Sequence, residues 1–353
     1  MARHRGRLAL GGLLAFALLF LFFRGVDWNA LVGAFRTADP LYLLGVVLAT
    51  QSQYLVRAWR WGFLLAPLAS VPYGRLFSAT TVGFMTGLLV PRAGELVRPY
   101  LVARRHSLRT SAAFASIILE RLLDLVTVLL LFGLYLYALP APAAQVAGPL
   151  LAVLKSAGAL AGLGAVAALA VLLAFHLRAD AVMLQVERVL GLVPPRAAAP
   201  VSRALRSFAE GLEVLRASPM HLLALLGQSA AVWLFIALGV YLNNRAFGID
   251  LPFHTSFLIL GFLTVGVAIP TPGMVGGFHE SYLLAMTEAY GVDRDTAAAA
   301  GIACHALTNL PVLVLGLLFL GNEGLSVGKV TKMSEEMAGS DASPAASVPE
   351  GRP

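Results

Sequence analysis

Charged residues are scarce in this sequence. Asp, Glu, Lys and Arg together make up 13% of its 353 residues, about half of what a soluble globular domain carries. Hydrophobic residues make up 58%, and apolar runs this dense must face lipid rather than water. These proportions exclude a soluble globular enzyme, so the chain is better divided into membrane spans than into soluble domains.

Cysteine is almost absent, since Cys304 is the only one. No disulfide can form within the chain, and no cysteine-based metal site is possible. A glycine-rich phosphate loop, an HExxH zinc motif and a G-x-S-x-G nucleophile elbow are also missing. We therefore expect no cofactor and no metal, and hydrolytic or ATP-driven chemistry has no recognisable site.

Long apolar segments predict an all-α polytopic membrane protein with about six full spans. The first is interpreted as an uncleaved span rather than a signal peptide, because no small-residue cleavage site follows it. Two further stretches, 75–91 and 253–270, each run into a Pro/Gly break and a second helical stretch, which predicts two opposed re-entrant helical hairpins; kinked spans are the alternative. The predicted spans are 8–23, 41–56, 112–139, 156–176, 220–242 and 296–320.

The placement of Lys and Arg supports this count. The formal net charge is +7, which need not mean nucleic acid, because cations collect on the cytoplasmic side of membrane proteins. With the N-terminus inside, most of the cations, Arg57 and Arg60 among them, fall on that side. We therefore expect a multi-pass protein of a bacterial-type inner (plasma) membrane, with both termini cytoplasmic and no nucleic-acid partner.

The chain divides into one membrane domain and a tail. Residues 1–325 form the transmembrane domain, and residues 326–353, rich in Ser, Ala, Pro, Glu and Gly, are expected to be a disordered cytoplasmic tail. Within the domain, residues 177–219 predict an amphipathic cytoplasmic loop, whose basic helix either is solvated or contacts anionic lipid.

Two parts of the domain resemble each other. Residues 81–83 match 264–266, and 120–124 match 305–309, at offsets of 183 and 185. Three predicted crossings separate the hairpins, so the repeats would be antiparallel, as in transporters whose substrate site lies between inverted repeats. Chance alignment of apolar helices is the alternative. The repeats would cover about 74–139 and about 253–320.

The first break carries three ionisable residues. Arg92, Glu95 and Arg98 follow Pro91 at a spacing of three. In a helix they would lie on one side, at positions that rotate gradually around the helix axis. A charge at the bilayer centre costs about 2.5 to 3.5 kcal/mol, which makes these residues functional candidates. The two guanidiniums could hold a phosphate, Glu95 could orient one of them or accept an ammonium, and Gly94 would let backbone approach the ligand. The alternative is an internal salt bridge that stabilises the hairpin. The salt bridge and the phosphate site are compatible with each other.

A predicted span carries a second group. Glu120 and Asp124 lie four residues apart on one face, with Arg121 about 100° round the helix. Buried charges need partners, and Arg92 or Arg98 are the nearest by topology. We interpret the group as a charge network that links span and hairpin, rather than as a catalytic acid pair.

The second break is rich in glycine. Free backbone N–H groups in such a segment can form a nest that suits an anion. His279 could relay a proton or donate to a phosphate, with Glu280 as its partner; a packed turn with a hydrogen-bonded histidine is the alternative. The candidate residues here are Pro272, Gly273, Gly276, Gly277, His279 and Glu280.

These motifs together resemble the transmembrane, or flippase-like, domain of lysylphosphatidylglycerol synthases. In bifunctional members this domain is thought to move aminoacylated phosphatidylglycerol across the bilayer, while a soluble domain transfers lysine from lysyl-tRNA. Only a short tail follows Leu320, so the resemblance implies translocation rather than synthesis. Ala306 stands where the family usually has an arginine, which weakens the inference about the substrate. The motif residues are Pro91, Arg92, Gly94, Glu95, Arg98, Glu120, Arg121, Asp124, Pro270, Pro272, Gly273, Gly276, Gly277 and Glu280.

From these observations we expect a transporter rather than an enzyme. It would bind a membrane lipid with a phosphate head group, anionic or aminoacylated, between the two hairpins and flip it between leaflets. The alternatives are a membrane enzyme acting on lipid-linked phosphates or sugars, and a non-catalytic partner of a lipid-modifying synthase or glycosyltransferase.

Overall fold

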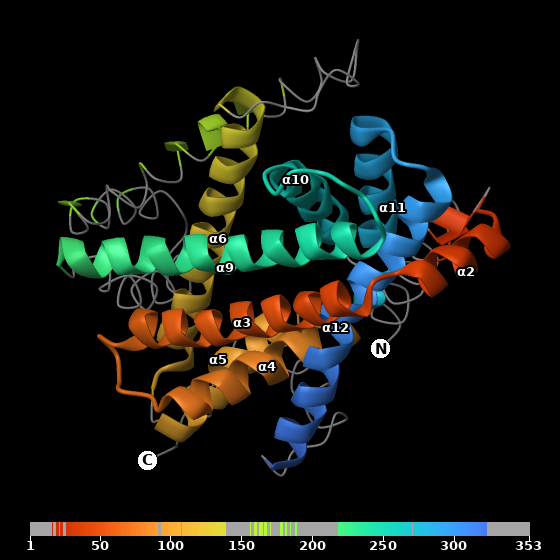
Figure 1. Ribbon diagram of the computed structural model, residues 1–353. Helices are drawn as coiled ribbons and strands as arrows, with labels where there is room; N and C mark the ends of the chain where they lie inside the picture. Colours follow the sequence, from red (N-terminus) through yellow and green to blue (C-terminus); the bar gives the residue numbers. More distant parts are fainter. Residues whose placement is uncertain are drawn as a thin grey trace, which may run out of the picture.

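The computed structural model describes residues 26–90, 93–106, 108–138, 218–269 and 271–322, with scattered positions in 16–23 and 156–188. Every element in these ranges is helical (Figure 1), which confirms the predicted all-α class for this part of the chain. The elements are α2 (Trp28–Thr37), α3 (Pro40–Leu65), α4 (Tyr73–Leu89), α5 (Ala93–His106), α6 (Thr110–Ala138), α9 (Pro219–Ala246), α10 (Thr255–Ala268), the 3₁₀ turn η2 (Pro272–Met274), α11 (Gly277–Leu284), the π-helical turn η3 (Ala285–Ala289) and α12 (Arg294–Asn322).

Several of these helices begin at capping residues. Asp27 precedes α2 and accepts a hydrogen bond from the backbone N–H of Asn29 at 2.8 Å. Asp39 caps α3 in the same way and is followed by Pro40, whose missing N–H costs nothing in the first turn. Ser218 caps α9. The short-range chemistry of the sequence therefore sets where these helices start.

The predicted apolar segments coincide with helices in the described ranges. The segments 112–139, 220–242 and 296–320 correspond to α6, α9 and α12. The segment 41–56 is only the first part of α3, which continues to Leu65. The segments 8–23 and 156–176, the loop 177–219 and the tail 326–353 lie wholly or largely outside the described residues, so the count of six spans stays a prediction.

Two helical hairpins stand out, α4–α5 and α10–α11, each closed by a pair of glycines. A methyl group on Gly94 would overlap the carbonyl oxygen of Gly83, and a methyl group on Gly277 would overlap that of Gly266. Only glycine lets two backbones approach this closely. The two pairs are equivalent in sequence, since 83 and 266 and also 94 and 277 are 183 positions apart.

The hairpins pack against longer helices. Helices α3 and α9 run side by side and antiparallel, α6 crosses them, and α12 passes along α4 (Figure 1). Gly316 of α12 lies against Met85 of α4, and Gly261 of α10 lies against Phe132 of α6. The first hairpin is therefore held between α3, α6 and α12, and the second between α6 and α12.

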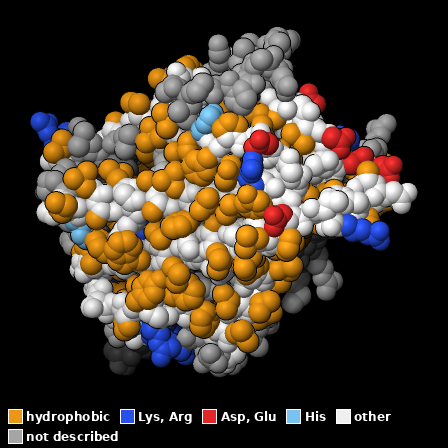
Figure 2. Space-filling model, in the orientation of Figure 1, with side chains coloured by type: hydrophobic (Ala, Val, Ile, Leu, Met, Phe, Trp, Pro, Cys, Tyr) orange, Lys and Arg blue, Asp and Glu red, His pale blue; other side chains and the backbone are white. Residues whose placement is uncertain are grey.

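Much of the apolar surface faces outward. Hydrophobic side chains cover most of the face in Figure 2, with few charges among them. Leu41 and Leu48 on α3 and Leu318 on α12 are more than half exposed, and exposed apolar patches of this extent mark a lipid or protein contact. Among the described helices, residues 220–246 and 294–321 are long and apolar enough to cross a membrane, and α2 with α3 would be a third if that pair, bent by 83°, is one span.

Candidate functional site: a charged cavity between two hairpins

Two carboxylates on α6 form the centre of a buried ion-pair network. Glu120 is fully buried, and Asp124 is 5% exposed, one helical turn further on. Nη1 of Arg98 and Nη2 of Arg121 each donate to Oε1 of Glu120 at 2.8 Å. This arrangement confirms the predicted network between hairpin and span, because Arg98 belongs to α5 and Glu120 to α6.

Asp124 is paired differently from the prediction. Nη1 of Arg57 donates to its Oδ2 at 2.6 Å, and Nη2 of Arg60 donates to its Oδ1 at 2.8 Å. Both arginines are on α3 and are buried. From the sequence they are expected among the cytoplasmic cations; in the structure they are buried within the protein, because α3 continues past residue 56 and its next turns point these side chains inward.

The two missed arginines had a signal in the sequence. Gln53, Arg57 and Arg60 follow one another at helical spacings of four and three, so a continued helix would carry all three on one face. In the structure Nε of Arg57 donates to Oε1 of Gln53 at 2.7 Å, and Nη1 of Arg60 donates to Oγ of Ser229 on α9 at 2.8 Å. The network thereby joins α3, α5, α6 and α9.

Arg98 makes a second kind of contact. Its guanidinium lies over the ring of Trp61, 4.0 Å from the ring centroid, a cation–π arrangement that suits arginine better than lysine. Its Nε and Nη2 have no hydrogen-bond partner among the residues that the structure describes. Arg98 is therefore fixed in place by Glu120 and Trp61 while two of its donor groups remain unused.

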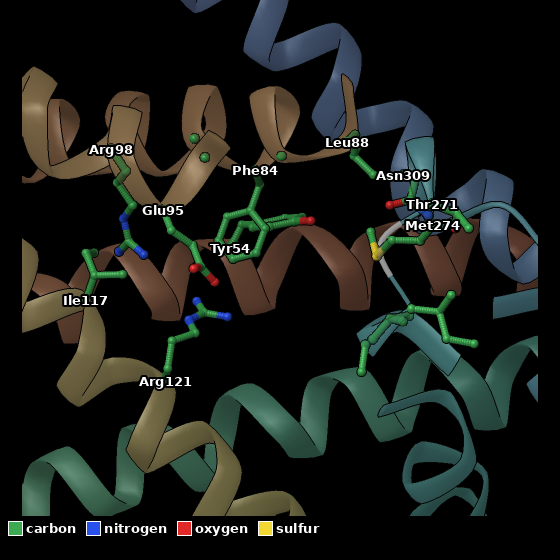
Figure 3. A pocket seen from close by; sticks show the side chains of 16 residues that line it. Tyr54, Phe84, Leu88, Glu95, Arg98, Ile117, Arg121, Thr271, Met274 and Asn309 are labelled. Atoms are coloured by element: carbon green, nitrogen blue, oxygen red, sulfur yellow. The ribbon is translucent and has the colours of Figure 1, made fainter. Parts of the chain in front are cut away.

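A cavity of about 290 Å³ opens beside this network, between the two hairpins (Figure 3). Arg98, Glu95 and Arg121 line one end, and Tyr54 and Phe84 lie between that end and the other (Figure 3). The opposite end is uncharged and is formed by the tip of the second hairpin together with a residue of α12. Its lining residues there are Val267, Ala268, Ile269, Thr271, Met274 and Asn309.

The charged end carries an excess of positive charge. Four guanidiniums, those of Arg57, Arg60, Arg98 and Arg121, surround the two carboxylates of the network. Glu95 is exposed at the cavity and points toward Arg121 (Figure 3). Among the described residues of the network, four guanidiniums therefore face three carboxylates once Glu95 is included. A buried excess of this sign favours an anion.

The two hairpins have equivalent backbone geometry but carry different side chains at equivalent positions. Arg98 packs on Gly83 in the first hairpin, and Ser281, 183 positions later, packs on Gly266 in the second. Asn309 on α12 stands where the repeat alignment has Asp124. The second half therefore offers neutral groups where the first offers charges, which gives the cavity one charged and one uncharged end.

The predicted residues of the second break lie behind the cavity rather than in it. Thr271 and Met274 line it, but the predicted candidates of this segment do not. Nδ1 of His279 lies 3.4 Å from the N–H of Gly276, and Nε2 of His305 lies 2.8 Å from the carbonyl oxygen of Gly273. The two imidazoles pack together behind the loop, an arrangement typical of a packed turn. Glu280 is half-buried on α11, Pro272 and Gly273 form η2, and Gly277 begins α11.

Arg92, the first of the predicted arginines, lies outside the described residues, as does Pro91. Of the two described arginines that line the cavity, Arg121 is the more exposed: its side chain is 38% exposed, whereas that of Arg98 is 3% exposed. Of the predicted residues, the structure brings together Gly94, Glu95, Arg98, Glu120, Arg121 and Asp124.

Comparison with known proteins gives two matches. The family model described as "Lysylphosphatidylglycerol synthase TM region" matches residues 8–316. The chain is also 25% identical, over 358 residues, to "Glycosyltransferase AglD" of Haloferax volcanii. This second match covers 92% of the chain and 55% of that relative, so the chain spans about half the length of the relative it matches.

Proposed function

The chain belongs to the lysylphosphatidylglycerol synthase TM region family, and from this membership we propose that it binds the phosphate of a lipid head group in the cavity between its hairpins and carries that lipid between leaflets. Family membership and the apolar helices make it a multi-pass membrane protein related to lipid or glycolipid biosynthesis. The flipping step and the choice of lipid are our proposal.

One observation carries the proposal: a cavity with a cationic end and an uncharged end lies between two glycine-closed hairpins. Arg121 and the unused donors of Arg98 would hold the phosphate, because guanidiniums bind phosphate oxygens through paired hydrogen bonds. The uncharged end, with Val267 and Ile269, would accept the apolar part next to the head group. In the membrane, the hairpins would be re-entrant and antiparallel, and the cavity would then lie near the bilayer centre.

Reconstitution into liposomes tests this proposal. Vesicles of neutral lipid would carry a labelled lipid of one class at a time, from anionic phospholipids, aminoacylated phosphatidylglycerol and polyprenyl phosphates, and chemical quenching would report the fraction that crosses. We expect the protein to accelerate crossing of at least one phosphate-bearing class. If no class crosses faster than in protein-free vesicles, the proposed function is wrong.

The matched variants are Arg121→Gln and Arg245→Gln. Arg121→Gln removes the cavity-facing cation, and since Arg98 still pairs with Glu120, the fold is expected to persist. A charged hydrogen bond is worth about 1.5 to 3 kcal/mol, so crossing should slow by about ten- to a hundredfold. Arg245 pairs with Asp250 outside the cavity, and its replacement should leave crossing unchanged.

A second function is favoured by the relative's name, which describes a glycosyltransferase. The chain would then act on a lipid-linked sugar or phosphate. Turnover of such a lipid in detergent, where no leaflets exist, would distinguish an enzyme from a flippase. Among the described residues, however, both carboxylates of the network are held by arginines, which disfavours them as a general acid and base.

A further inference from the structure

Glu95 is the one carboxylate among the described residues that lines the cavity. It lies on the first turn of α5, directly after Gly94, and its side chain is exposed at the cavity, whereas Gly94, Val97 and Arg98 on the same helix are buried. Its carboxylate points across the cavity toward the guanidinium of Arg121 (Figure 3), and the two groups attract each other electrostatically. A carboxylate in an anion site needs an explanation.

We propose that Glu95 is an internal counter-anion: it neutralises the cavity-facing side of Arg121 while the cavity is empty, and the phosphate of an incoming lipid competes with it for that guanidinium. This inference rests on the proposed function and identifies Glu95 as the residue that lowers the affinity of the same site for phosphate. Unlike a residue that accepts an ammonium group, a counter-anion weakens the binding of every anionic ligand.

The geometry around Arg121 supports the competition. Nη2 of Arg121 donates to Glu120 at 2.8 Å, and its Nη1 lies 3.6 Å from Asp124. Both of these carboxylates are buried within the network and are shared with other arginines. Among the described residues Glu95 is not shared with a second arginine, and it reaches Arg121 from the cavity side. It is therefore the carboxylate that a ligand can displace without opening the buried network.

The sign of the electrostatic effect follows from this arrangement. A phosphate that enters the cavity is repelled by Glu95 as well as attracted by Arg121 and Arg98. At separations of a few ångströms and an effective dielectric constant of about 20, one unit charge contributes enough to change affinity by about tenfold or more. Because repulsion scales with ligand charge, a phosphomonoester dianion gains more from the loss of Glu95 than a phosphodiester monoanion.

The test measures binding to the full chain purified in a neutral detergent, with short-chain lipids as probes. The probes are dihexanoyl phosphatidic acid, a phosphomonoester, and dihexanoyl phosphatidylglycerol, a phosphodiester, with dihexanoyl phosphatidylethanolamine as a probe that carries an ammonium group. The variants are Glu95→Gln and the matched control Glu288→Gln, which removes the same charge from an exposed position outside the cavity. Dissociation constants come from isothermal titration calorimetry.

We expect Glu95→Gln to bind phosphatidylglycerol about tenfold more tightly and phosphatidic acid more tightly still, with Glu288→Gln unchanged. The gain should be smaller in an Arg121→Gln background, because the competition for that guanidinium is lost and only the direct repulsion between Glu95 and the phosphate remains. A merely structural role for Glu95 would not separate the two anionic probes.

Two results would overturn the inference. If wild type binds the anionic probes and Glu95→Gln binds them equally or more weakly, Glu95 is not a counter-anion, and the proposed function stands. A loss of phosphatidylethanolamine binding alone would assign Glu95 to an ammonium instead. If neither wild type nor any variant binds a phosphate-bearing probe, the proposed function fails together with the inference.

Discussion

Asp124 on α6 accepts a hydrogen bond from Arg57 on α3, 67 residues earlier, with Nη1 and Oδ2 2.6 Å apart. Arg60 binds the other oxygen of the same carboxylate. One carboxylate thus neutralises parts of two buried guanidiniums, which ties α3 to α6.

Asp124→Asn should destabilise the protein severely. The change keeps the side-chain shape but leaves Arg57 and Arg60 without their counter-charge, and breaking a buried ion pair costs about 3 to 5 kcal/mol. Thermal unfolding in detergent, followed by size-exclusion chromatography, would measure the loss. Asp250→Asn is the control, because Asp250 is 86% exposed and an exposed pair contributes only about 0 to 1 kcal/mol. Equal shifts in the two variants would show that the buried pair is not a stabilising element.

Gly94→Ala and Gly277→Ala should each open one hairpin. The added methyl group overlaps the carbonyl oxygen of Gly83 or Gly266, and forced overpacking costs about 1 to 3 kcal/mol or more. We expect a lower melting temperature for both. Gly133→Ala on α6 meets nothing within 4 Å and should be neutral or slightly stabilising. A tolerated Gly94→Ala would mean that the hairpin does not close as described.

Ala268→Trp should block lipid crossing without disturbing the charges. Ala268 is exposed on α10 and lines the uncharged end of the cavity, so an indole there would occupy the space that the lipid needs. Liposome crossing should be lost, while thermal stability stays near that of wild type. Val265→Trp adds the same ring to α10 at a position 71% exposed and outside the cavity lining. If Val265→Trp blocks crossing equally, the effect does not come from the cavity.

The predicted orientation can be tested with single cysteines. Cys304 is 1% exposed and should not react with a maleimide in the folded protein, so the natural chain is a silent background. Ser70→Cys, between α3 and α4, should be labelled only by a reagent that reaches the cytoplasm. Asp250→Cys, between α9 and α10, should react with an impermeant reagent added outside. Labelling of both positions from one side would contradict the predicted number of crossings.

Local patterns predicted the helices well. The segments expected at 112–139, 220–242 and 296–320 became α6, α9 and α12 within a few residues, because long apolar runs form helices whatever packs around them. The Pro/Gly breaks likewise marked the hairpin tips. The apolar segment 41–56 is shorter than the helix it belongs to, since α3 continues to Leu65 and turns Arg57 and Arg60 inward.

The candidate site was predicted only in part. Scarce charge within apolar segments pointed to Glu95, Arg98, Glu120, Arg121 and Asp124, and all five lie at the cavity or in its network. In the second break Gly277 serves backbone packing and Gly273 and Gly276 have positive φ, while the cavity there is lined by neutral residues such as Thr271 and Met274.

Composition and spacing were sufficient to establish a helical membrane protein with a short group of buried charges, because burying an ionisable residue is costly enough to be selected against unless it is used. Which charges pair could not be read from the chain. The partners of Asp124 lie 64 and 67 positions away, and that distance closes only when α3 packs on α6. The same packing leaves the Arg121 side chain more exposed than that of Arg98, so the folded arrangement, and not the motif, sets how each arginine faces the cavity.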